Sequence, residues 1–118
     1  MRTLIAFVFV ALLAGCTTTE RQESIQRKSL KEVAAAFPVG MPANSISKAA
    51  EDRGWKLSSD QMTTDWSGPD KSVLVDRVFT VSLPKHAGVP FSFAVFGYVG
   101  SKGGSVVVQH VVVEANAL

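Results

Sequence analysis

The fold of this chain is decided by residues 91–115, which read FSFAVFGYVGSKGGSVVVQHVVVEA. Large apolar side chains alternate with smaller or polar ones over 91–99, which is the two-residue repeat of a half-buried strand. The Ser-Lys-Gly-Gly stretch at 101–104 supplies the glycines that a tight hairpin turn requires. A second strand is predicted over 105–115. Because it carries valines on both faces, we expect it to be central in the sheet or to meet another surface with its second face.

A third strand is predicted upstream of this hairpin, over residues 73–83. Its large apolar side chains alternate along one face and are interrupted by Arg77. The members of that face are Val73, Val75, Phe79, Val81 and Leu83. Residues 84–90, which include two prolines, make the turn into the next strand. The polar interval 58–72 is predicted to be irregular, with Trp66 either in a short strand or over an open edge of the core.

A short helix is predicted over residues 29–37. Ser29 and Glu32 have the spacing of a capping box, in which each side chain satisfies a free backbone N–H of the other residue. Apolar side chains then recur on one face at helical spacing, and Pro38 ends the helix. That face consists of Leu30, Val33, Ala34 and Phe37.

A second helix is predicted from Pro42 or Ser45 to Arg53. Its apolar residues, which we expect to be buried, are Ile46, Ala49 and Ala50. Gly54 stands where a left-handed C-cap is needed, and Trp55 follows where a contact back onto the helix is usual. We therefore expect Trp55 to be a core residue rather than a ligand-binding one.

These elements predict a two-layer α+β sandwich, in which two short N-terminal helices pack on one face of an antiparallel sheet of three or four strands. Four aromatic residues lie on the two faces of one predicted strand, so their burial should show which sheet face the helices cover. Phe91 and Phe93 share one face of their strand, and Phe96 and Tyr98 share the other. We expect the helices to cover one pair and to leave the other pair less protected.

The beginning of the chain has the organisation of a secretory leader, with Arg2 followed by the apolar run 4–13. Ten helical residues rise only about 15 Å, half of a roughly 30 Å hydrocarbon core, so this run is too short for a stable membrane span. It ends in a tetrapeptide that resembles the lipobox of bacterial lipoproteins, Leu13, Ala14, Gly15 and Cys16. The resemblance implies that 1–15 is a removed signal peptide and that the Cys16 thiol carries an acyl group such as palmitate. The alternative is a buried thiol on an N-terminal helix.

Residues 16–28 are polar and charged, with Ile25 as their only large apolar side chain, and are predicted to be a flexible tether. Such a tether reaches roughly 20 Å, which lets residues 29–118 stand off the membrane as a single domain. The alternative is that residues 16–28 extend the first helix. Thr17, by resemblance to lipoprotein sorting in double-membraned bacteria, implies anchoring in the outer membrane with the domain facing the periplasm.

Gly40 and Met41, followed by Ile46, resemble the Gly-Met-x-x-x-x-Val signature that opens the second helix in the SmpA/OmlA (BamE-like) family of small outer-membrane lipoproteins. Members of that family are similar in having a lipobox, a polar tether, two short helices and a final β-hairpin. Where the family commonly has Gly-Thr-Pro, this chain has Gly-Trp-Lys at 54–56. The resemblance implies that the three matching residues are structural, at the helix start and in the core.

The sequence lacks a recognisable catalytic constellation, so we expect a protein that is not an enzyme and needs no cofactor. His86 lies in a proline-flanked loop and His110 lies between valines in a strand. We expect no metal site, since Asp60, Asp65 and Asp70 lack the alternating ligands and the glutamate of a calcium loop. The net charge is only +2, and the lysines and arginines form no stripe, which argues against a nucleic-acid partner.

The features together favour a lipid-anchored scaffold or assembly module of the outer membrane, which presents a sheet edge or face to an envelope protein. The alternative is an inhibitor or immunity protein whose loop at 85–89 plugs a hydrolase cleft. A third hypothesis, binding of a small ligand or lipid between the helices and the sheet, has no convergent polar groups to support it.

Overall fold

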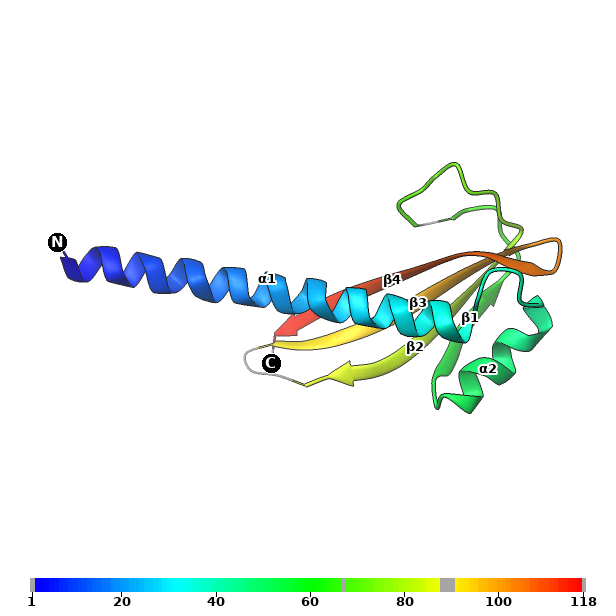
Figure 1. Ribbon diagram of the computed structural model, residues 1–118, viewed down its shortest axis with the longest axis horizontal. Helices are drawn as coiled ribbons and strands as arrows, with labels where there is room; N and C mark the ends of the chain where they lie inside the picture. The colour runs from blue at the N-terminus through cyan, green and yellow to red at the C-terminus, as the bar shows by residue number, and fades with distance from the viewer. Residues whose placement is uncertain (1, 67, 88–90, 118) are drawn as a thin grey trace.

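The computed structural model describes the backbone of residues 2–66, 68–87 and 91–117, and the side chains of residues 19–66, 68–87 and 91–116. Two α-helices, a 3-10 turn and four strands follow one another along the chain (Figure 1). They are α1 (Arg2–Ala36), η1 (Ala43–Ser45), α2 (Ile46–Asp52), β1 (Lys56–Gln61), β2 (Arg77–His86), β3 (Phe91–Lys102) and β4 (Ser105–Ala117). The predicted α+β class is confirmed, with the sheet in its four-stranded form.

The sheet is an antiparallel meander with the strand order β1-β2-β3-β4. The valine-rich strand β4 is therefore an edge strand, and the expectation that it is central is wrong. Its inward valines, Val106, Val111 and Val113, are buried in the core that the helices cover. On its other face, Val108 packs against the small cluster around Trp66, so its second face does meet something.

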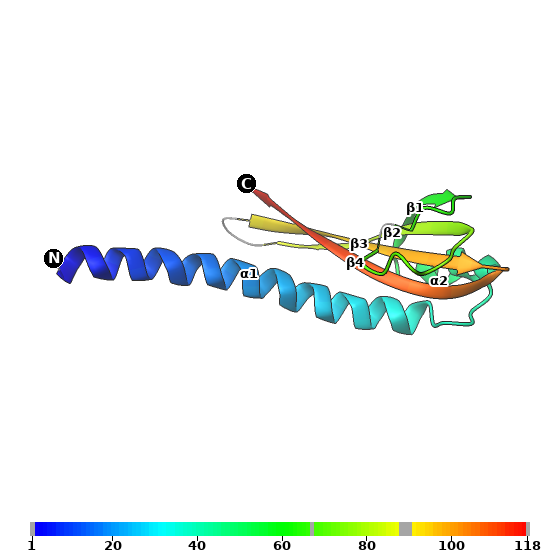
Figure 2. The same ribbon diagram turned by 90° about the horizontal axis from the view of Figure 1, so that it is seen from above.

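The helices and the sheet enclose one main hydrophobic core. Figure 2 shows α1 running along the sheet as a separate layer. Val33 of α1 and Phe37, which directly follows the helix, are fully buried. They lie in the core with Ile46 from α2 and with Val81, Val95 and Val99 from the strands. We call the sheet face that carries this core the inner face.

The first helix is much longer than predicted, because α1 spans 35 residues and does not begin at Ser29. Ser29 lies inside the helix with only 3% of its surface exposed, so the predicted capping box does not form a helix start. Residues 16–28 are helical rather than a flexible tether, which is the alternative left open above. The reason is that glutamate, glutamine, lysine and arginine are good helix formers, and Ile25, 7% exposed, continues the apolar stripe onto the sheet.

The second helix and its C-cap are as predicted. Ile46 and Ala50 are buried, and Ala49 is partly buried against the core. Gly54 has φ +73°, its N–H donates to the carbonyl of Glu51, and the N–H of Trp55 donates to the carbonyl of Ala50. These are the two hydrogen bonds of a Schellman motif. The ring of Trp55 then packs 6.0 Å from that of Phe37.

Two strand boundaries differ from the prediction. β1 lies in the polar region after Trp55 and was not expected as a defined strand, since most of its side chains are exposed. β2 begins at Arg77 rather than at residue 73 and continues to His86, beyond the predicted turn start at residue 84. Val73 and Val75 precede the strand and pack against Trp66 instead.

The final hairpin is confirmed. Gly103 and Gly104 have φ of +60° and +81°, as a type I′ turn requires at both central positions. The carboxylate of Asp76 accepts a hydrogen bond of 2.9 Å from the N–H of Gly103. A register shift between Gly100 and Ser101 lets β4 bulge opposite β3 near this turn.

Candidate binding face of the sheet

The face of the sheet opposite the helices, which we call the outer face, is the candidate functional surface. Side chains alternate between the two faces along each strand, and residues that pair across neighbouring strands lie on the same face. From β2, β3 and β4 the outer-face residues are Val78, Thr80, Ser82, Ala94, Phe96, Tyr98, Gly100, Val108, His110 and Val112. More than half of them are apolar or aromatic.

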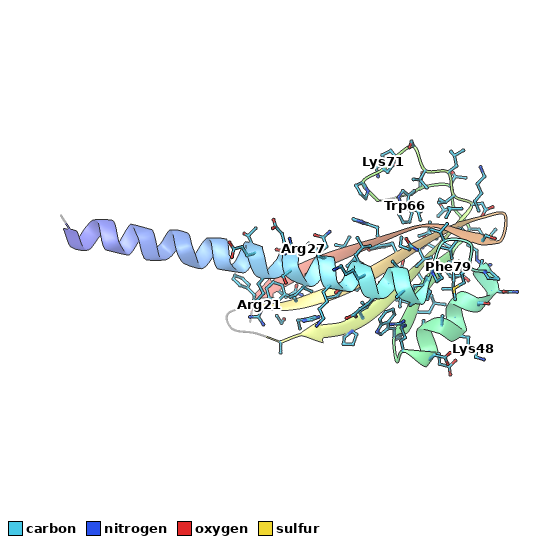
Figure 3. All side chains as sticks on the ribbon, in the orientation of Figure 1. Arg21, Arg27, Lys48, Trp66, Lys71 and Phe79 are labelled. Carbon is cyan, nitrogen blue, oxygen red and sulfur yellow. The ribbon has the colours of Figure 1, made fainter. Side chains whose placement is uncertain are left out.

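One end of the outer face is covered by the loop between β1 and β2. Trp66, from this loop, is 5% exposed and packs with Val75 and Val78. A Cβ added at Gly100 would lie 3.2 Å from Trp66 Cε3, so the indole lies directly over a glycine of β3. Figure 3 shows Trp66 and Lys71 on this loop. Trp66 therefore covers a sheet face, rather than lying in a short strand.

The anchoring of this loop is mostly apolar. The ammonium group of Lys71 donates a hydrogen bond of 3.1 Å to the carbonyl of Trp66. The indole N–H of Trp66 is buried and has no hydrogen-bond partner among the described residues. A buried N–H without a partner costs free energy, so packing against Gly100 must offset that cost.

Away from the Trp66 loop, most of the outer face is only half-buried, although Ala94 is buried. Phe96 lies opposite Val112, and Tyr98 lies opposite His110, in neighbouring positions of the β3–β4 pair. Phe96, Tyr98, His110 and Val112, which we call the aromatic strip, are all partly exposed. The prediction about the aromatic pairs is confirmed for Phe93, which is 1% exposed on the inner face while Phe96 and Tyr98 are less protected. Phe91, its partner on the inner face, packs against the core but is only partly buried.

His110 contributes an imidazole to the aromatic strip. Burial lowers the pKa of its imidazole below the usual 6.5. A lowered pKa favours the neutral ring, which can donate from one nitrogen and accept at the other. At neutral pH the His110 ring is therefore mostly uncharged.

The free edge of β4 is capped by side chains from α1. Gln22 Nε2 donates to the carbonyl of Val113 at 2.7 Å, and Gln26 Nε2 donates to the carbonyl of Val111 at 3.1 Å. At the end of α1, the side chain of Gln109 in turn donates to the carbonyl of Phe37. The bonds from Gln22 and Gln26 occupy carbonyls of β4 that an added strand would need.

The predicted motif residues lie at the other end of the same edge. Gly40 has φ +93° and its N–H donates to the carbonyl of Val106, whose own N–H donates to the carbonyl of Met41. Met41 packs against the core, and Ile46 begins α2 fully buried. Gly40 and Met41 thus join the loop before α2 to β4, a pairing that nothing in the sequence pattern indicates.

The predicted lipidation site lies in the N-terminal half of α1. The backbone of Leu13, Ala14, Gly15 and Cys16 is part of this helix, and their side chains lie outside the described residues. Among the residues whose side chains are described, no helix is long and apolar enough to cross a membrane.

Arg77 and Asp60 form an ion pair within the described part of the chain. Arg77 holds Asp60 through two hydrogen bonds of 2.7 and 2.5 Å, and this pairing lowers the pKa of Asp60. The guanidinium group also lies 4.7 Å from the ring centre of Phe79, which explains an arginine in an apolar row. Within the described ranges, no three histidine, cysteine or acidic side chains converge as metal ligands would.

Comparison with known proteins does not assign this fold to a family. No family model, no curated protein and no solved structure matches the chain.

Proposed function

We propose that this protein is a lipid-anchored scaffold or assembly module of the outer membrane, facing the periplasm, and that its outer face binds an envelope protein. The observation that carries this proposal is the uncovered aromatic strip. Both helices lie on the inner face, and the Trp66 loop covers only one end of the outer face. Phe96 and Val112 are left half-exposed side by side.

The chemistry of the strip fits a protein partner. Aromatic residues are enriched among the side chains that dominate the binding energy of protein interfaces. Thr80 and Ser82, beside Tyr98 and Phe96 in the β2–β3 pairing, add hydroxyl groups at the border of the strip. An apolar centre with a polar border is the usual anatomy of such interfaces.

Addition of a partner strand is disfavoured at one edge, because α1 and the Gly40–Met41 segment occupy the backbone of β4. The opposite edge strand, β1, is short and exposed, with a register shift between Leu57 and Ser59. Register shifts and charged side chains make an edge a poor template for pairing. These features favour the face over the edges as the binding surface.

The anchor rests on the lipobox resemblance at Cys16. Several acyl chains, at about 0.8 kcal/mol per buried methylene, hold a protein at a membrane far more firmly than one chain does. The resemblance of Gly40, Met41 and Ile46 to the SmpA/OmlA signature supports the same compartment and an assembly role.

The test is a crosslinking pull-down of the native protein from membranes. We expect envelope proteins to be recovered with the wild type and lost with Phe96→Asp, which places a charge in the centre of the strip. The matched control is Leu74→Asp, since Leu74 is 68% exposed and lies outside the outer face set. Equal recovery with the two variants would reject the outer face as the binding surface.

Cys16→Ala tests the anchor in the same experiment. We expect this change to release the protein from membranes and to reduce recovery of membrane-bound partners. Recovery of one soluble hydrolase, retained after Cys16→Ala, would replace the scaffold proposal by that of an inhibitor.

A further inference from the structure

The position of Cys16 relative to the sheet is fixed by α1. Arg21 ties the helix to one end of the sheet, since its guanidinium donates a hydrogen bond of 3.1 Å to the carbonyl of Ala87. Gln22 follows with its bond to Val113. The backbone is helical from Arg21 back through Cys16, and five helical residues rise only about 8 Å.

These contacts are made at one particular end of the sheet. Ala87 follows β2, Phe91 begins β3, and Phe91 pairs with Ala117 at the end of β4. Figure 2 shows the N-terminal part of α1 projecting past this end, with the β3–β4 hairpin at the opposite end. We call the former the proximal end and the hairpin end the distal end. The length of β3 separates them by about 35 Å.

The segment between Cys16 and the sheet does not act as a loose tether. Arg21 lies 5.4 Å from the ring centre of Phe93, besides its bond to Ala87 (Figure 3). Ile25, one turn later, is buried in the main core. A domain held in this way moves with its helix, whereas a flexible tether would let it turn freely above the membrane.

We propose that the proximal end of the sheet rests on the lipid surface and that the distal hairpin points away from it. This inference rests on the proposed function, since it requires Cys16 to be acylated. An acylated Cys16 lies in the membrane interface, and the helix places the proximal end within one or two turns of it. The aromatic strip is then presented side-on to proteins that lie close to the membrane.

Charge is not what holds the proximal end at the lipid. Arg21 and Lys85 are positive there, and Glu20 and Glu114 are negative nearby, so the local charge nearly cancels. Attraction to anionic lipid needs clustered lysine and arginine. The contact should therefore occur equally on zwitterionic vesicles.

The test compares two exposed lysines at opposite ends of the sheet, Lys85 in β2 and Lys102 in β3. Lys85→Cys and Lys102→Cys are each made in the native lipidated protein, in which acylation consumes the Cys16 thiol. Each introduced thiol carries a fluorophore, and the protein is inserted into phosphatidylcholine vesicles that contain a headgroup-level quencher lipid. We expect several-fold stronger quenching at position 85 than at position 102.

Vesicle flotation is measured on the same samples, so that two kinds of failure are separated. Failure to float would reject the lipid anchor, and the inference with it. Flotation with equal quenching at the two positions would reject only the inference, and would show that the domain turns freely on its anchor. Stronger quenching at position 102 would reverse the orientation and also overturn the inference.

Discussion

Gln22 and Val113 are joined by a 2.7 Å hydrogen bond from a helix side chain to a strand carbonyl, and Gln26 repeats this bond to Val111. The two glutamines are four residues apart on α1, a rise of about 6 Å. The two valines are two residues apart on β4, a rise of about 7 Å. This match of the two repeats lets one helix face satisfy alternate carbonyls of an edge strand, and it fixes the part of α1 around Gln22 and Gln26 against the sheet.

The glutamine pair predicts a measurable contribution to stability. Gln22→Ala with Gln26→Ala should lower the free energy of unfolding by about 1–3 kcal/mol, because each hydrogen bond contributes about 0.5–1.5 kcal/mol net. Alanine keeps the helix propensity high, so the loss reports on the bonds to β4. The measurement is a urea titration followed by circular dichroism.

The matched control for this pair is Glu23→Ala with Arg27→Ala, one position further along the same turns. Both side chains are exposed, and surface substitutions usually change stability by less than about 0.5 kcal/mol. If the two double variants lost equal stability, the bonds to Val111 and Val113 would not be what holds the helix to β4.

Gly100 sets how closely Trp66 can approach the outer face. A Cβ there would lie 2.7 Å from Val75 Cγ1 and 2.8 Å from Val108 Cγ1, besides the indole. Gly100→Ala should therefore displace the Trp66 loop, at a cost of about 1–3 kcal/mol, and should make one of the two tryptophans accessible to acrylamide. Gly103→Asn is the control, because a Cβ at Gly103 meets nothing within 4 Å and asparagine tolerates its positive φ. Unchanged quenching in Gly100→Ala would contradict the tight contact.

Substitution of Gly54 should lower the stability of the protein through backbone strain and not through a change in packing. The φ of Gly54 is +73° and a Cβ would meet nothing within 4 Å. The effect of replacing this glycine should therefore depend on how readily the new residue adopts a positive φ. Gly54→Ala should destabilise the protein by about 1–2 kcal/mol, and Gly54→Asn by less, since asparagine adopts this conformation more readily. Thermal unfolding of both variants measures the difference. A larger loss with asparagine would mean that its side chain, not the backbone, is at fault.

The parts of the fold that could be predicted are those with a strong local signal. The Gly-Gly turn at 103–104 and the glycine C-cap at Gly54 each require a backbone conformation that few other residues adopt. The helical state of residues 16–28 could not be predicted, because the face that Gln22 and Gln26 present is polar and has a role only once β4 lies beside it. β1 could not be predicted as a strand for a similar reason, since an exposed polar edge strand has little hydrophobic periodicity.

The outer face could be predicted only in part. Alternation along the strand separates Phe96 and Tyr98 from Phe93, which is a property of the sequence. Which of the two faces the helices would cover is a property of the tertiary structure. The Trp66 contact with Gly100 joins residues that lie 34 positions apart, and no spacing rule reaches that far. Glycine in a strand interior is the only signal that marks a close approach there.

His110 predicts a dependence of stability on pH. Burial lowers its pKa in the folded protein below 6.5, so between these two values the unfolded chain binds more protons than the folded one. Stability should therefore be complete above about pH 6.5 and should fall as the pH decreases toward the lowered pKa, with a slope of at most about 1.4 kcal/mol per pH unit. Asp60 and Asp70, whose pKa values lie below 3.8, stay ionised throughout this window.

Urea titrations between pH 7.5 and pH 5 measure how the free energy of unfolding depends on pH. Comparison of His110→Asn with His86→Asn shows which of the two histidines causes this dependence. The slope should be reduced in His110→Asn and retained in His86→Asn, because His86 lies at the end of β2, away from the aromatic strip. A slope that survives in His110→Asn and vanishes in His86→Asn would locate the titrating group at the proximal end instead. As the pH falls, His110 becomes charged before Asp60 loses its charge. Acidification should therefore make the aromatic strip less apolar before it breaks the Arg77–Asp60 pair.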